Sequence, residues 1–172
     1  MATRNIQIVG TGQLLELSRR LKQAGGPRLK ANFTRRIRRA AEPLKADMQA
    51  TIRTLPIRPE PRKSGSRGGP SPTTRPLRAT IAQAVSIQVR TGVMPGARVY
   101  VDRAKLPRDL KRMPKAMNRE SGRIRHMVFG NKKRWHNNWT TPLWWEKTAT
   151  KHQPRMRAEV ARVLDDVRNS LS

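Results

Sequence analysis

Large apolar side chains are concentrated in one segment of this chain, Ser121–Trp145. All four tryptophans lie there, together with Phe129, one of only two phenylalanines in the sequence. Each buried Trp or Phe removes roughly 150–250 Å² from water, so this segment holds most of the chain's capacity to bury large side chains. It is also rich in Arg and Lys. It can therefore form a hydrophobic core, a protein-binding surface or a platform for nucleic acid.

The net charge constrains the partners of the chain. Thirty-eight basic residues face 11 acidic ones, which gives a net charge of +27. So much charge of one sign repels other copies of the protein and attracts polyanions, so we expect contact with nucleic acid or an acidic protein surface.

No apolar run is long enough to span a membrane, and no cysteine is present for a disulfide or thiolate metal site. The N-terminal residues lack a secretory signal pattern, so we expect the protein inside the cell that makes it.

Apolar spacing predicts a long N-terminal helix and a β-hairpin. Over Arg28–Leu55 the apolar residues recur every three or four positions, which predicts a helix of about seven turns, kinked at Pro43. The segments Ser86–Arg90 and Ala97–Asp102 alternate and predict an antiparallel hairpin. Asn5–Val9 alternates weakly and predicts a further short strand. Short helices are also predicted over Gln13–Ala24 and Leu77–Val85.

The last third of the chain predicts further strands and an amphipathic C-terminal helix. His126–Phe129 is expected to join the sheet, and Trp135–Trp139 to return as another strand. Pro142 is suited to the first position of the last helix, with Thr141 as its N-cap. Pro154 is expected to separate a short helical piece from the main helix. We therefore predict an α+β fold in a single domain of residues 1–172, with the long helices packed on a small antiparallel sheet.

Residues 56–76 have a different composition from the rest. Six prolines, three glycines and almost no apolar side chain predict a flexible insertion loop that cannot bury enough surface to become ordered alone. Five basic residues face a single acid, Glu60, so this loop is a candidate arm that contacts DNA or a partner protein; an inert loop is the alternative. The candidate contact residues are Arg58, Arg62, Lys63, Arg67 and Arg75.

The sequence lacks a pattern typical of an active site. The three histidines do not have the spacing of a metal-binding pair on a helix, and the acids are mostly isolated. The glycine-containing stretches GTG and GVMPG lack the lysine and hydroxyl residues of a phosphate-binding loop. We therefore expect no enzymatic activity, no catalytic residue, no metal and no cofactor.

The aromatic segment has two interpretations. On a strand, Trp135 and Trp139 would share one face, with His136 and Asn138 on the other; in a basic frame they would suit single-stranded nucleic acid. The interpretation we favour is a core and subunit interface, in which Phe129 and Trp135 are mostly buried. A basic run then frames the contact surface, namely Arg123, Arg125, Lys132, Lys133 and Arg134. The candidate residues are Arg125, His126, Phe129, Trp135, Trp139, Trp144 and Trp145.

The run Arg125–Asn131, RHMVFGN, followed by Trp135, resembles the "RHPVFGN…W" signature of tail-completion (neck) proteins of long-tailed double-stranded-DNA bacteriophages. The resemblance extends to three further stretches. These are TTRPLRATI, the pairs Leu106–Pro107 and Met113–Pro114, and the closing PLWWEKTATKHQPRMRAEVARVLDDVRNSL. It is most specific over residues 105–171. The chain departs from the signature at Met127, where proline is usual, and at the three residues after Trp135, where glutamine is common.

The resemblance implies a structural virion protein, made in the host bacterial cytoplasm and located in the neck or tail of the particle. It implies a homo-oligomeric ring of six subunits around the DNA channel, contacting the head–tail connector and the tail terminator or tail-tube proteins, with nonspecific contact to the packaged DNA. A tail terminator or head-closure ring protein is a close alternative. A free cytoplasmic nucleic-acid-binding protein is the alternative from a different class.

Overall fold

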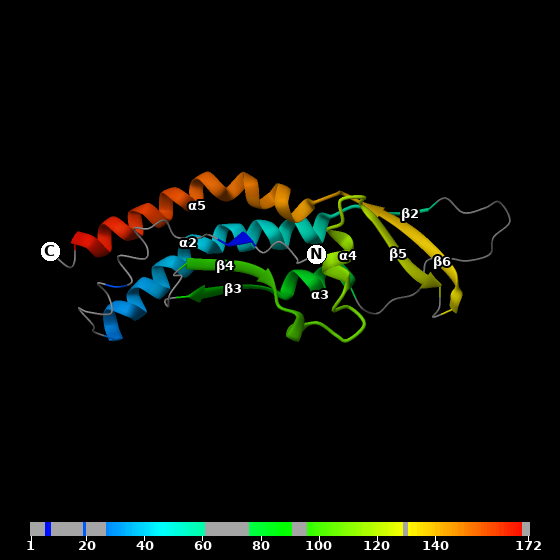
Figure 1. Cartoon of the computed structure of the whole chain (residues 1–172), viewed down its shortest axis with the longest axis horizontal. Coiled ribbons are helices and arrows are strands. Elements are labelled where there is room, and N and C mark those ends of the chain that lie inside the picture. Colours follow the sequence, from blue (N-terminus) through cyan, green and yellow to red (C-terminus); the bar gives the residue numbers. More distant parts are fainter. Residues whose placement is uncertain are drawn as a thin grey trace.

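The computed structural model describes residues 6–7, 19, 27–60, 76–90, 96–128 and 131–169. These residues form an α+β fold, as predicted, with two long helices and two separate three-stranded antiparallel sheets (Figure 1). We predicted a single sheet, so the predicted number of sheets is wrong. The helix predicted over Gln13–Ala24 lies outside the described residues, apart from the helical residue Arg19. No helix in the described ranges is both long and apolar enough to cross a bilayer.

The predicted long N-terminal helix is confirmed as α2, Pro27–Thr54, with Pro43 inside it. The side chains of its apolar stripe are almost fully buried because they face the rest of the core. Figure 1 shows the first half of α2 turning away from the line of the second half, as expected for a helix with an internal proline. The buried side chains of the stripe are Phe33, Ile37, Ala41, Leu44, Met48 and Ile52.

The predicted hairpin is also confirmed, as β3 (Val85–Arg90) and β4 (Gly96–Val101), which pair in antiparallel register. The short strand β1 (Ile6–Gln7) adds to the other edge of β4. The helix α3 (Leu77–Gln83) precedes the hairpin and is held to α2 by a hydrogen bond from Gln49 to the carbonyl of Ala82 (3.0 Å). This sheet packs against α2 through buried aliphatic residues, chiefly Val85, Ala97 and Val99.

The C-terminal helix α5, Trp144–Asn169, runs antiparallel beside α2 (Figure 1). It is continuous through Pro154, so the predicted break there is wrong. Contacts on both sides of the proline hold the helix to the body: Nε2 of His152 lies 2.7 Å from the Asp47 carboxylate of α2, and Met156 is buried. These contacts offset the loss of one backbone hydrogen bond at the proline.

The start of α5 also differs from the prediction. The helix begins at Trp144, not at Pro142, and Leu143 precedes it with a φ of 48°. Its N-terminal amides are capped by Asn118, which accepts a hydrogen bond from the Trp145 N–H (2.9 Å) and donates to the Glu146 carboxylate (2.8 and 3.0 Å). Asn118 directly follows the short helix α4 (Met113–Met117), itself preceded by the 3-10 turn η1 (Arg103–Lys105). The cap is therefore supplied from outside the helix.

The second sheet, which we call the projecting sheet, consists of β2 (Ile57–Pro59), β6 (Asn131–Thr140) and β5 (Arg123–Val128), in that spatial order. Figure 1 shows it extending beyond the ends of α2 and α5. The strand prediction is confirmed for both long strands. It is wrong for Ile57–Pro59, which belong to an edge strand and not to a loop.

Candidate functional site

A glycine at its base positions the projecting sheet. Gly122 has a φ of +63°, donates its N–H to the Arg119 carbonyl (3.0 Å) and accepts a hydrogen bond from the Thr140 N–H (2.8 Å). A Cβ at this position would lie 2.5 Å from the Thr140 oxygen. Both the left-handed backbone and the lack of space require glycine here. The turn fixes where β5 leaves the body and where β6 returns to it.

The strand register places basic and aromatic residues on one face of this sheet. Opposed residues in an antiparallel pair lie on the same face, and so do alternate residues of one strand. Trp139 is opposite Arg58 of β2 on one side and Arg123 of β5 on the other. This row therefore has a tryptophan between two arginines. We call the face the Trp–Arg face; its described members are Arg58, Arg123, Arg125, Trp135, Asn137 and Trp139.

Both tryptophans of the Trp–Arg face are exposed, Trp135 at 46% and Trp139 at 45%. The prediction that Trp135 is mostly buried is therefore wrong, and Trp139, a candidate for the core or a subunit interface, is not part of the core. The guanidinium of Arg125, itself an exposed residue, lies 4.5 Å from the centre of the Trp135 ring, a cation–π contact. Trp144 and Trp145, in contrast, are buried as predicted, with their rings in an edge-to-face contact at 5.4 Å.

The acidic residue that follows β2 has a structural role. Glu60, which follows β2, donates its N–H to the Asn137 carbonyl (3.0 Å), and its carboxylate accepts from the Asn137 side-chain amide (2.9 Å). These bonds hold the short edge strand to β6. The three strands themselves contain no acid and six basic residues, namely Arg58, Arg123, Arg125, Lys132, Lys133 and Arg134. Within the three strands, therefore, no carboxylate neutralises this positive charge.

The opposite face carries His136, as the strand pattern predicted, together with His126. His126 and His136 are direct cross-strand partners with ring centres 5.7 Å apart, and the Asn138 amide lies 3.1 Å from Nε2 of His126. A metal site needs at least one further ligand group. Within the described ranges no three His, Cys, Asp or Glu residues are grouped to hold a metal ion.

The structure therefore brings together part of the predicted site. Arg58, Arg125, Trp135 and Trp139 meet on the Trp–Arg face, whereas Trp144 and Trp145 belong to the body. The predicted residues Arg62, Lys63, Arg67, Arg75 and Phe129 lie outside the described residues. The sequence placed Arg123 in the basic run that frames the aromatic segment, but it did not identify the positioning residues Asn118 and Gly122. Strand alternation, which links Arg123 to Arg125, assigns both arginines to one face of the sheet.

Comparison of the chain with protein-family models, with curated proteins and with solved structures finds no match.

The chemistry of the Trp–Arg face suits two kinds of contact. Exposed indole rings between guanidinium groups can pack against a protein surface, where Trp and Arg commonly supply much of the binding energy. They can also stack on bases while the guanidinium groups contact phosphates.

Proposed function

We propose that this protein is a structural subunit of a phage neck or tail top, which assembles with copies of itself into a ring that completes the tail and joins it to the head connector around the DNA channel. The Trp–Arg face carries the proposal. It displays two large apolar rings on a sheet that projects from the body, where a neighbouring subunit can reach them. The motif resemblance of residues 105–171 supports the same role.

The composition of the face favours protein assembly. Trp and Arg are the residue types most enriched at the energetic centres of interfaces, and a side chain at 45–46% exposure still has much apolar area left to bury. A ring is closed by a heterologous contact, in which this face would meet a different surface of the next copy. Six copies, with connector and tail-terminator or tail-tube proteins above and below, form the proposed neck assembly in the virion.

A second function, nucleic-acid binding by a free protein, is favoured by one specific observation. The row Arg58–Trp139–Arg123 puts a guanidinium group on each side of an exposed indole, as a single-strand stacking platform requires. The two functions respond oppositely to salt. Screening the charge of a +27 protein favours contact between copies, whereas nucleic-acid binding weakens steeply as salt rises.

Sedimentation velocity of the full chain over a range of protein and salt concentrations tests the assembly function. We expect discrete oligomers whose population grows with salt, and their loss in the Trp135→Ala/Trp139→Ala variant. The matched control is Gln88→Ala/Arg90→Ala, which truncates two exposed alternate residues on strand β3. A double tryptophan variant that assembles like the wild type would contradict the proposal. Tryptophan quenching by single-stranded DNA that fades with salt, without self-association, would instead support the second function.

A further inference from the structure

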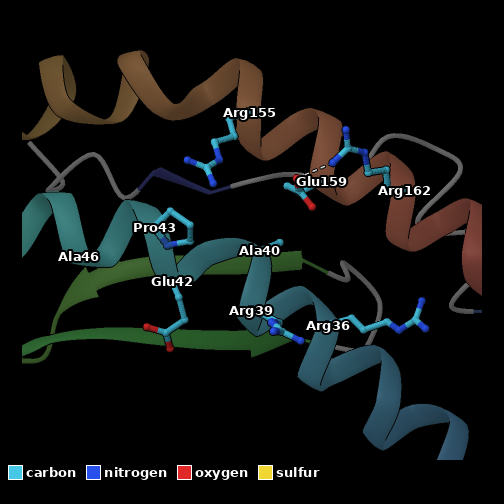
Figure 2. Close-up of a pocket in the computed structure, with 9 residues that line it drawn as sticks. All are labelled: Arg36, Arg39, Ala40, Glu42, Pro43, Ala46, Arg155, Glu159 and Arg162. Carbon is cyan, nitrogen blue, oxygen red and sulfur yellow. Dashed lines mark hydrogen bonds and ion pairs between the residues drawn. The ribbon is translucent and has the colours of Figure 1, made fainter.

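We propose that an arginine-lined groove between α2 and α5 binds the phosphodiester backbone of double-stranded DNA. The groove has a volume of about 760 Å³ and is bounded by both helices at the level of Pro43 (Figure 2). It is a different surface from the Trp–Arg face, because none of its lining residues comes from the projecting sheet. The inference therefore stands independently of the ring.

The groove is cationic because its carboxylates are already paired. Four arginines and two glutamates line it. Glu159 accepts from Arg162 (2.9 Å) on α5, and Glu42 is paired with Lys45 (3.3 Å) on α2. Within the described ranges, Arg39 and Arg155 make no ion pair with a carboxylate. Figure 2 shows Arg155 reaching from α5 toward α2, and Arg39 and Glu42 on the side of α2 away from α5.

The bend of α2 and the charge of its first half support the same site. The proline at position 43 lies on the wall of the groove, where the two helices diverge toward the N-terminal half of α2. Residues 27–41 contain six basic residues and no acid. Arg36 and Arg39, three residues apart on the helix, both line the groove and are a like-charge pair that destabilises an isolated helix. Binding of an anion would relieve this repulsion.

The lining favours a duplex backbone over single-stranded nucleic acid. Single strands are held by stacking of bases on aromatic rings, and no lining residue of the groove is aromatic. Guanidinium groups on a surface that lacks aromatic rings suit phosphate contacts, which are independent of base sequence. Arg39 and Arg155 come from different helices, and each supplies one such contact.

Fluorescence anisotropy with a short labelled DNA duplex tests this site. The full chain and the Arg39→Gln/Arg155→Gln variant are titrated at several salt concentrations. Affinity falls as salt rises, and each lost phosphate contact makes the plot of log affinity against log salt less steep by about 0.9. We therefore expect the slope of the variant to be less negative by about 2. The Arg39→Lys/Arg155→Lys variant keeps the charge and should keep the slope.

A control variant, Lys111→Gln/Arg112→Gln, removes the same net charge from exposed residues outside the groove. It should change the slope by much less. An unchanged slope in the groove variant, or an equal loss in the control, would overturn the proposal. Binding of poly-glutamate but not of the duplex would also overturn it and would assign the groove to an acidic protein. Sedimentation of the groove variant separates this failure from failure of the ring, because its self-association should match that of the wild type.

Discussion

The four tryptophans divide into two pairs that lie in two different environments. Trp144 and Trp145 are 2% and 7% exposed where α5 meets the body, whereas Trp135 and Trp139 are nearly half exposed on the projecting sheet. The two pairs are separated by only a few residues of sequence. In the body, the rings are part of the hydrophobic core, whereas the rings on the projecting sheet are not. The first pair therefore stabilises the fold, and the second is available for binding.

The largest expected effect separates the two environments with the same substitution. Trp144→Ala should lower the free energy of unfolding by about 3–5 kcal/mol, because it leaves a large cavity in a packed core. Trp139→Ala should cost about 0.5 kcal/mol or less, as for an exposed residue. Chemical denaturation followed by circular dichroism measures both. Equal losses would show that the two pairs are not in different environments.

The next effect concerns the base of the projecting sheet. Gly122→Ala places a methyl group against the Thr140 carbonyl and forces a positive φ on a residue with a Cβ, so we expect a loss of about 1–3 kcal/mol. Glu120→Ala, two residues earlier and exposed, is the control. Thermal unfolding compares the two. A Gly122→Ala variant as stable as the control would mean that the turn can rearrange at little cost.

A smaller effect is expected at the cap of α5. Asn118→Ala removes the acceptor of the Trp145 N–H and the donor to Glu146, and should cost about 1–2 kcal/mol. Asn118→Asp keeps the acceptor but places a carboxylate against Glu146, so it should recover only part of the loss. Denaturation midpoints at neutral pH provide the measurement. Full stability in Asn118→Ala would contradict the capping role.

The smallest effect is the cation–π contact on the Trp–Arg face. The Arg125–Trp135 pair is exposed, so its coupling energy should be about 0.5–1 kcal/mol. A double-mutant cycle with Arg125→Ala, Trp135→Ala and the double variant measures it. A coupling energy of zero would indicate that the arginine does not hold the ring in place.

The helices were largely predictable from sequence because their signals are local. The three-to-four spacing over Arg28–Leu55 reports which face is buried, and it identified α2 nearly to its ends. The hairpin followed from alternation. The interior Pro154 misled the prediction, because propensity at a proline favours a break while the contacts of His152 and Met156 with the body keep α5 continuous.

The burial of the aromatic residues could not be predicted in the same way. Alternation assigned Trp135 and Trp139 to one face of a strand, and this is confirmed, but sequence pattern does not say whether another element covers that face. The short edge strand at Ile57–Pro59 was hidden by its proline-rich composition, which edge strands tolerate. The cap of α5 was missed because Asn118 is distant in sequence from the amide it binds.

Image reconstruction of the intact particle's neck tests the central claim most directly, namely that the Trp–Arg face is the surface by which copies of this protein meet. We predict a ring of this protein at the head-proximal end of the tail, with Trp135 and Trp139 buried against the adjacent subunit. A particle that lacks the protein, or a ring in which both tryptophans face solvent, would contradict the claim.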